Sequence, residues 1–326
     1  MLHDPILAVT IDTEADNQWS PAGRRHLLFQ NIRALPRLEA LFEKYGIRPT
    51  YLLTHDVASD SESAHYFRRL LKTGRCEVGA HFHPWTTPPV VEREIEEGTY
   101  PHHLPEEYHY EKMLHLTQTI EGNIGVRPVS FRAGRWGFNG HSVRLLEKLG
   151  YQTDSSVTPF YSWEKDGGPA FVDAPLHPYF PDDEDVCREG NSALLEVPVT
   201  IGLSGVLTYF PEGMLRNLRR HRSLSEFLVR FKLLGTLWLR PSYTSAKGMM
   251  RLSRRVLDEG GKVLTMMFHS SEIVTGGSPH HPNEAALSYF FDQLEEILSY
   301  LIRERHLKSC TLSEVYRQWV GNGSSS

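Results

Sequence analysis

The stretch Ile6-Leu-Ala-Val-Thr-Ile-Asp12-Thr-Glu14 joins an uninterrupted apolar run to two carboxylates. A strand that helices cover on both faces need not alternate polar and apolar residues, so residues 6–11 are predicted to form a buried strand of a parallel sheet. Similar short runs recur along the chain and are separated by amphipathic stretches. We expect the strands at residues 6–11, 49–53, 77–80, 129–131, 151–153, 194–201 and 262–268. This alternation predicts an α/β fold.

Segments with helical periodicity lie between the predicted strands. Behind the predicted N-cap Asn283, apolar residues recur three and four positions apart, at Leu287, Phe290, Phe291, Leu294, Ile297, Leu298 and Leu301. Gly46 and Gly150 each follow an apolar helical pattern, which predicts that they end two further helices in a left-handed conformation. Pro36 is expected to kink or restart the helix that contains it.

The chain of 326 residues contains no linker rich in proline, glycine or serine, and no internal repeat. The simplest organisation is one domain over residues 1–320 with a flexible tail at 321–326. A chain of this length suits a distorted (β/α) barrel, similar to a TIM barrel, of about seven strands with loop and helical insertions. The expected insertions are residues 86–110 and 160–245.

Composition excludes several classes of protein. Lys and Arg total 35 and Asp and Glu total 40, a formal net charge of −5, so nucleic acid is not an expected partner. Cys76, Cys187 and Cys310 are odd in number and far apart, which argues against a disulfide framework. No apolar run approaches the roughly 20 residues that span a bilayer, and no charged leader precedes the first strand. A cytoplasmic location is therefore expected.

Polar side chains directly follow most of the predicted strands. They are Asp12, Glu14, His81, His83, Arg132, Arg135, Asp154 and His269. Because the carboxyl ends of barrel strands meet at one rim, we expect these side chains to converge there. The sequence therefore places a candidate site at that end of the barrel.

The histidines at positions 81 and 83 are the main indication of a metal. Residues two apart on an extended segment point the same way, so His81 and His83 can present two imidazoles to one point. Two histidine nitrogens and one carboxylate oxygen make the ligand set of a catalytic zinc site, and a divalent metal, zinc, is predicted here. The carboxylate is Glu14 or Asp16, and the sequence leaves this choice open. A further carboxylate could act as base and a histidine opposite as acid.

Each candidate also has a purely structural interpretation. A carboxylate pair after a strand often forms a turn or a helix N-cap, and Asp16-Asn17 suits that role. A histidine at a strand end can simply be hydrogen-bonded in the core, and Arg132 can be a buried structural arginine. Other histidines are expected at the surface or in a lid, namely His102, His103, His109, His115, His280 and His281.

The order of these residues resembles the five motifs of the polysaccharide deacetylase family, carbohydrate esterase family four, over residues 6 to about 310. Thr10-Ile-Asp12-Thr-Glu14 resembles the first motif, in which a base aspartate precedes a metal-binding acid. The family's second motif has two histidines four apart, whereas His81-Phe-His83-Pro-Trp85 has them two apart. The later motifs are matched in part by Arg132-Ala-Gly-Arg135-Trp136, Asp154-Ser-Ser and Met267-Phe-His269. The stretch that matches the third motif, Arg132 to Trp136, lacks the family's proline and tyrosine.

The resemblance implies a metal-dependent hydrolase that removes N-acetyl groups from an amino sugar of a polysaccharide or its precursor. It implies that Asp12 is the base, that His269 is the acid and that Arg132 holds the Asp12 carboxylate in position. Asp154 would pair with that arginine or orient the histidine, and a backbone amide near Arg135 would help to hold the oxyanion. The metal ligands would be Glu14, His81 and His83. The N-acetylated saccharide could be lipid-linked or nucleotide-linked.

Two other functions remain open. The displaced histidine and the missing proline and tyrosine suit a non-catalytic sugar-binding or regulatory relative of the deacetylases. Another metal-dependent amidohydrolase or phosphoesterase would also use His-x-His, but such enzymes place it on the first strand, which here carries the acids. No glycine-rich phosphate loop follows the first strand, which argues against a nucleotide-dependent sugar enzyme.

A basic helical insertion is expected at about residues 212–242. From residue 213 on it has one acid, Glu226, and seven basic residues, which are Arg216, Arg219, Arg220, Arg222, Arg230, Lys232 and Arg240. Apolar residues lie among them at helical spacing, which suits peripheral contact with an anionic membrane that carries a lipid-linked sugar. The alternative is a helix packed on the barrel with a solvated basic face.

Overall fold

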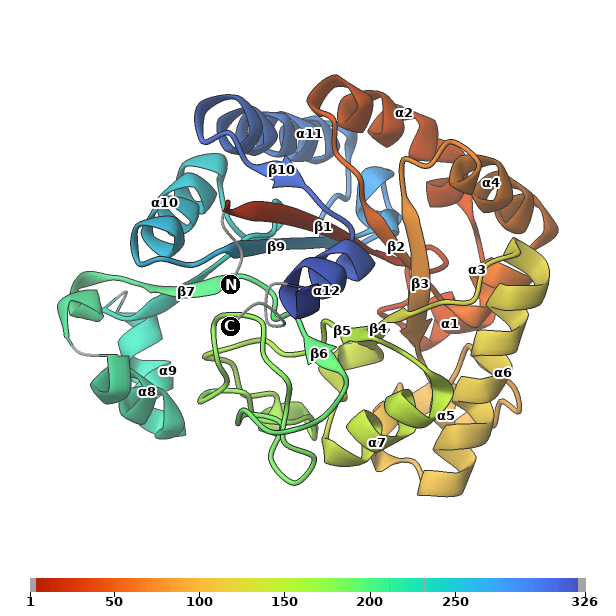
Figure 1. Cartoon of the computed structure of the whole chain (residues 1–326), viewed down its shortest axis with the longest axis horizontal. Helices are drawn as coiled ribbons and strands as arrows, with labels where there is room; N and C mark the ends of the chain where they lie inside the picture. The colour runs from red at the N-terminus through yellow and green to blue at the C-terminus, as the bar shows by residue number, and fades with distance from the viewer. Residues whose placement is uncertain (1–3, 211, 232, 322–326) are drawn as a thin grey trace.

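The computed structural model describes residues 4–210, 212–231 and 233–321. Its centre is a curled parallel sheet in the order β9-β1-β2-β3-β4-β5-β6, and β10 pairs with the start of β1 (Figure 1). The bounds are β1 Ile6–Thr13, β2 Thr50–Leu53, β3 Glu77–Phe82, β4 Ser130–Ala133, β5 Thr153–Asp154, β6 Leu195–Glu196, β9 Val263–His269 and β10 Lys308–Ser309. The predicted distorted (β/α) barrel is confirmed.

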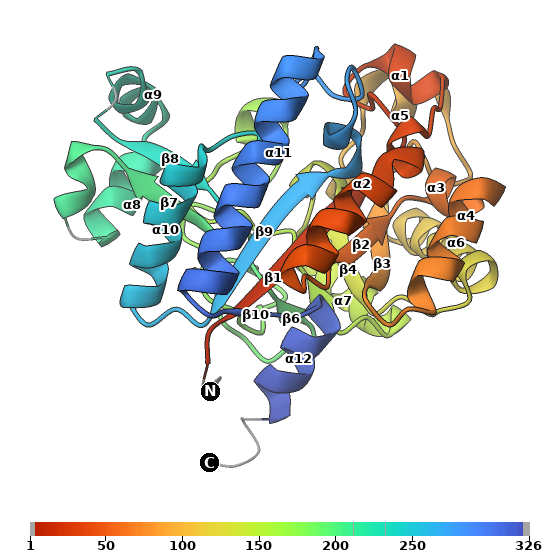
Figure 2. The same ribbon diagram turned by 90° about the horizontal axis from the view of Figure 1, so that it is seen from above.

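Most of the helices surround this sheet on its outer side, whereas α12 packs against its inner side (Figures 1 and 2). Their bounds are α1 Pro21–Arg25, α2 Gln30–Tyr45, α3 His55–Ser59, α4 Ser61–Leu71, α5 Glu92–Glu97, α6 Glu106–Ile124, α7 Gly140–Leu149, α10 Ala246–Asp258, α11 Glu284–Ser299 and α12 Leu312–Gly321. Among the described residues, no helix has the length and apolar character that a membrane crossing requires. Residues 322–326 of the predicted tail lie outside the described residues.

The helix boundaries test three sequence predictions. Gly46 and Gly150 end α2 and α7 in the left-handed conformation, with φ of 64° and 83°, and the Asn283 side chain accepts from the backbone of α11, as expected. Of the two outcomes expected at Pro36, a kink or a restart, the restart does not occur, because α2 continues through it. Leu35 and other residues of its inner face are buried, and this packing offsets the helix-breaking tendency of proline.

Strand β1 shows how the barrel separates its core from its site. Leu7, Val9 and Ile11 belong to the large core between the sheet and the helices. The alternate residues Ile6 and Ala8 join a smaller core, which α12 covers with residues such as Leu312 and Val315. Because side chains alternate along a strand, the polar residues that follow at every second position lie on the same face as Ile6 and Ala8, nearer the opposite end of the barrel. Those residues are Thr10, Asp12 and Glu14.

The run at residues 194–201 does not form the single strand that was expected. It divides into β6 and β7 (Ile201–Ser204) around Pro198, which has no N–H for a sheet hydrogen bond. Strand β7 leaves the barrel to pair antiparallel with β8 (Gly235–Trp238). In the segment between β6 and β7, the Thr200 amide donates to the Thr265 carbonyl of β9 at 3.1 Å, and this hydrogen bond links the β6 side of the sheet to β9.

The predicted insertion at residues 86–110 lies over the barrel end that carries the site residues. It contains α5, and the fully buried Lys112 of α6 ties it down. The Lys112 ammonium donates to the carbonyls of Pro84 and Thr87 and to the Glu94 carboxylate, at 2.7 to 2.8 Å. This buried charge is fully paired and therefore holds the loop that follows β3.

The basic insertion forms α8 (Glu212–Arg220) and α9 (Arg222–Arg230), which project from one edge of the molecule between β7 and β8 (Figure 1). Arg216 and Arg219 donate to main-chain carbonyls of residues 160–174, and Arg220 pairs with Asp173. Arg216 and Arg219 thus contact the main chain and are only partly exposed, whereas Arg220 is exposed, as a solvated basic face predicts. Lys232 and the side chain of Arg222 lie outside the described part. Membrane contact through this insertion stays a prediction.

Candidate metal and catalytic site

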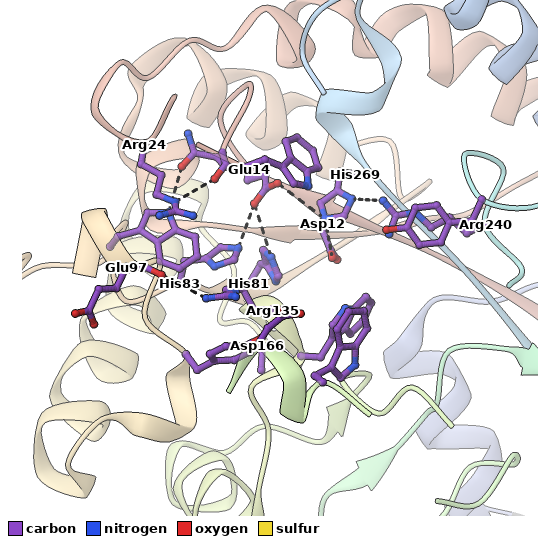
Figure 3. A pocket seen from close by; sticks show the side chains of 18 residues that line it. Asp12, Glu14, Arg24, His81, His83, Glu97, Arg135, Asp166, Arg240 and His269 are labelled. Carbon is purple, nitrogen blue, oxygen red and sulfur yellow. Dashed lines mark hydrogen bonds and ion pairs between the residues drawn. The ribbon is translucent and has the colours of Figure 1, made fainter. Parts of the chain in front are cut away.

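A pocket of about 330 Å³ opens at the carboxyl ends of β1, β3, β4 and β9 (Figure 3). Six of the residues predicted to converge line it together, namely Asp12, Glu14, His81, His83, Arg135 and His269. Arg132 and Asp154 do not line it and are fully buried below it. The predicted convergence at one rim thus holds for the ends of four strands, β1, β3, β4 and β9.

Glu14, His81 and His83 form a compact, buried group of ligand atoms. These atoms lie within 4.8 Å of one another, with Glu14 Oε2 3.1 Å from His83 Nε2 and 4.0 Å from His81 Nε2. His81 Nδ1 donates to the Arg132 carbonyl at 3.0 Å, so its Nε2 carries the lone pair toward the group. Two neutral imidazoles and one carboxylate are a donor set that suits zinc. The residues present therefore fit a divalent metal.

Asp16, the other acid that the sequence allowed as a metal ligand, instead caps a helix. Its carboxylate accepts from the amides of Gln30 and Asn31, at 2.8 and 3.3 Å, at the first turn of α2. These contacts satisfy free N–H groups of the helix end. The structure therefore places Glu14, and not Asp16, beside the two histidines.

Asp12 lies next to this group and is held by a buried arginine. Arg132 Nη1 donates to Asp12 Oδ1 at 2.6 Å, and Thr10 and Ser155 receive its other N–H groups. Burial raises the pKa of Asp12, but the charge and hydrogen bond of Arg132, together with the charge of His269, outweigh it and lower the pKa to about 2. Asp12 is thus ionised at neutral pH, with Oδ1 held by the guanidinium, the contact that the resemblance implies.

His269 faces Asp12 from the end of β9. Its Nε2 lies 3.8 Å from Asp12 Oδ2, while its Nδ1 lies 2.7 Å from Glu272 Oε1. Arg240 pairs with the same glutamate oxygen at 2.5 Å. Burial lowers the pKa of His269, but the hydrogen bond to Glu272 and the charge of Glu14 outweigh it and raise the pKa. The arrangement favours an imidazolium whose Nε2–H points into the pocket.

Sequence reasoning missed Glu272 and assigned its role to Asp154. The Asp154 carboxylate accepts from the amide and hydroxyl of Ser156, at 3.0 and 2.7 Å, and does not form an ion pair with Arg132 or orient His269. That prediction is wrong because β5 ends with Asp154 turned toward a buried partner, Glu196. Glu272 follows His269 by three residues in a short turn, a spacing that could have indicated it.

Two histidines expected at the surface or in a lid are buried. His109 of α6 stacks on Phe82 with 5.1 Å between ring centroids. His281 donates from Nδ1 to the carbonyl of Glu272 at 2.6 Å. Both are 4% exposed or less, so their environment is the protein interior. Neither belongs to the metal group.

Aromatic side chains form much of the pocket wall, a feature that was not predicted. They are Trp19, Trp85, Tyr100, Trp136, Trp163 and Tyr243. Most come from the insertions and the loops after β1, β3 and β4, which the tertiary fold brings together. Flat apolar faces beside polar groups suit a ligand with both kinds of surface.

Gly134 sets the position of the His83 ring, which leads to a prediction. A Cβ at residue 134 would lie 2.2 Å from His83 Nδ1 and 2.6 Å from the Phe82 carbonyl. Gly134→Ala is expected to displace the imidazole and weaken zinc binding by about 10- to 100-fold, measured by chelator competition. Gly122→Ala, where a Cβ meets no atom within 4 Å, is the control and should bind zinc like the parent. Equal affinity in both variants would contradict this packing.

The chain was compared with known proteins. No family model matches it, and no curated protein matches its sequence. A candidate glycoside hydrolase/deacetylase from Parabacteroides distasonis superposes with a TM-score of 0.63 at 16% identity, over 98% of this chain and 71% of that chain. A GH57-type branching enzyme from Pyrococcus horikoshii gives 0.54 at 12% identity, over 97% and 70%.

Polysaccharide deacetylases and family 4 carbohydrate esterases are also among the solved structures that match. The family 4 carbohydrate esterase from Streptomyces lividans matches at a TM-score of 0.43 and 12% identity, over 95% of this chain and 94% of that chain. At such identities these likenesses show the fold. The function is therefore argued from the site.

Proposed function

We propose that this chain is a metal-dependent deacetylase that hydrolyses the N-acetyl group of an amino sugar in a polysaccharide or its precursor. The observation that carries the proposal is the position of two titratable groups beside the metal-binding group. The ionised Asp12 and His269 face each other across 3.8 Å, and His269 Nε2 is 3.9 Å from Glu14. A base and an acid on either side of a Lewis-acid site is the arrangement that amide hydrolysis needs.

Glu14, His81 and His83 would hold the metal, with zinc as the proposed ion. When bound, such an ion lowers the pKa of water and polarises the carbonyl of the amide. Asp12 Oδ2 accepts the proton of the attacking water, since Arg132 occupies Oδ1. His269 Nε2 then donates a proton to the departing amine, while Glu272 holds Nδ1–H. The buried carboxylates and ring walls limit access of bulk water to these transfers.

The pocket wall supports a saccharide substrate. Its aromatic rings offer flat apolar surfaces for the C–H faces of a sugar, and its charged groups can bind hydroxyls. The likeness in fold to a candidate glycoside hydrolase/deacetylase is consistent with this class of ligand. The proposal includes a lipid-linked or nucleotide-linked sugar, whereas the pocket wall supports a saccharide in general.

Acetate release tests the proposed function. The zinc-loaded chain is incubated with N-acetylglucosamine oligomers, N-acetylated sugar nucleotides and N-acetylated hexosaminuronic acids, and acetate and free amine are both measured. We expect equal amounts of the two products from at least one substrate and none after zinc is removed. A chain that binds these sugars but releases no acetate would instead support the non-catalytic alternative, which the unusual histidine spacing favours.

A further inference from the structure

Two arginines on one side of the pocket are not used by the proposed reaction. Arg24 of α1 and Arg135, just after β4, both line the pocket, on the side away from His269 (Figure 3). Each binds main-chain carbonyls: Arg24 donates to Gln18 at 3.1 Å and to Ile95 at 2.7 Å, and Arg135 donates to Gly98. Among the described carboxylates, none forms an ion pair with either guanidinium.

The two guanidinium groups lie around one glycine, Gly98. A Cβ at this position would lie 2.6 Å from Arg24 Nη2, and the Gly98 carbonyl accepts from Arg135 Nη1. Each guanidinium also lies over an aromatic ring of the pocket wall, with Arg24 4.7 Å from the centroid of Trp85 and Arg135 3.9 Å from that of Tyr100. These contacts orient both groups before any ligand arrives.

The backbone at Arg135 is also unusual. Arg135 and Trp136 both have positive φ, of 52° and 62°, although neither is glycine. This left-handed conformation costs energy at each residue, and such residues concentrate at ligand-binding sites. It carries the Arg135 side chain from the end of β4 to Tyr100 and Gly98. The structure therefore maintains a strained turn that places a second positive charge beside the first.

Glu14 and Glu96 act on Arg24 through their charges, but the carboxylates around the pocket form their direct ion pairs with other groups, as Glu96 does with Arg25. Glu97 Oε1 pairs with Arg93 at 3.0 Å, and Asp166 is exposed at the edge of the pocket. Asp12 and Glu14 contact Arg132 and the histidines, and Arg240 on the opposite side is paired with Glu272. Two like charges held close together without a carboxylate between them repel each other, and a bound anion relieves that repulsion.

We propose that Arg24 and Arg135 bind an anionic group of the substrate, a carboxylate or a phosphate carried by the N-acetylated sugar. Guanidinium groups bind both anions through paired hydrogen bonds, and two of them can grip one group from two sides. The site would thereby select charged saccharides over neutral ones. This inference rests on the proposed function, because it takes a saccharide to be the occupant of the pocket.

Binding measurements test the inference independently of catalysis. Calorimetry on the zinc-loaded chain carrying Asp12→Asn compares neutral N-acetylglucosamine with N-acetylglucosamine 1-phosphate and N-acetylglucosaminuronic acid. We expect one of the charged sugars to bind about 10- to 100-fold more tightly than the neutral sugar, and added salt to reduce that difference. Which charged sugar binds more tightly distinguishes phosphate from carboxylate. Equal binding of charged and neutral sugars, or no binding of either, would overturn the inference.

Variants separate the arginines from the metal, which could itself attract a phosphate. Arg24→Gln combined with Arg135→Gln should remove the preference for the charged sugar and leave the neutral affinity within about twofold. Arg33→Gln, at an exposed arginine paired with Glu62, is the matched control and should keep the preference. Arg135→Gln alone serves if the double variant is unfolded by circular dichroism, and should lose most of the preference.

A preference that persists without these arginines would also overturn the inference. Acetate release is scored separately on the zinc-loaded chain and the arginine variants with Asp12 intact. Charge preference without acetate from any sugar would remove the proposed function and leave the anion site. Acetate release with no charge preference would support the proposed function and remove the anion site.

Discussion

Asp12→Asn is expected to abolish acetate release by the zinc-loaded chain, with kcat lowered by about 100- to 10,000-fold. Asparagine keeps an oxygen for Arg132 but cannot accept the proton of the attacking water at its other atom. Arg132 also keeps its hydrogen bonds to Thr10 and Ser155, so the fold should survive with a lower melting temperature. Acetate is measured by an enzyme-coupled assay and folding by circular dichroism.

Asp16→Asn is the matched control for this variant. It makes the same change four residues further along, where the carboxylate accepts from the first turn of α2. We expect a small loss of stability, because the amide oxygen can still accept, and unchanged zinc content and kcat. Loss of activity in Asp16→Asn together with retention in Asp12→Asn would contradict the assignment of the base.

His269→Ala is expected to lower kcat by about 100- to 10,000-fold through loss of the proton donor to the departing amine. Zinc content should be unchanged, since His269 is outside the metal-binding group. Glu272→Gln should have a smaller effect, because glutamine can still accept from His269 Nδ1 but no longer favours the protonated ring. Acetate release and zinc content of the two variants are compared with those of the parent.

The control for His269 is His115→Ala, at an exposed histidine of α6. This change should leave kcat and zinc content unaffected. Full activity in His269→Ala would remove this residue as the acid and would favour a mechanism in which solvent protonates the amine. Activity lost equally in both variants would show that the loss comes from destabilisation.

Much of the site was predictable because its residues follow strands directly. The apolar run before Asp12 and the two-residue spacing of His81 and His83 are local features, and the geometry of parallel strands brings them to one rim. The choice between Glu14 and Asp16 was not predictable. It depends on which acid meets the first turn of α2, and sequence shows no such contact.

The remaining errors come from contacts between distant segments. Arg240 lies beside the end of β9 and pairs with Glu272, although it comes from an insertion that looked like a basic surface segment. Asp154 follows a strand as the other site residues do, but β5 is short and its carboxylate turns toward buried partners. His109 was expected at the surface, yet α6 turns it onto Phe82. Periodicity gives the strands and helices, whereas these side chains depend on packing.

The most direct test of the account is the location of zinc in crystals of the purified chain, determined by anomalous scattering at the zinc edge. We predict one ion per chain, bonded to Glu14 Oε2, His81 Nε2 and the ring of His83, and no ion at this place in crystals of His83→Ala. Its occupancy should agree with the zinc content of the protein in solution. Zinc that is absent after loading, or that binds elsewhere while this group stays empty, would contradict the account.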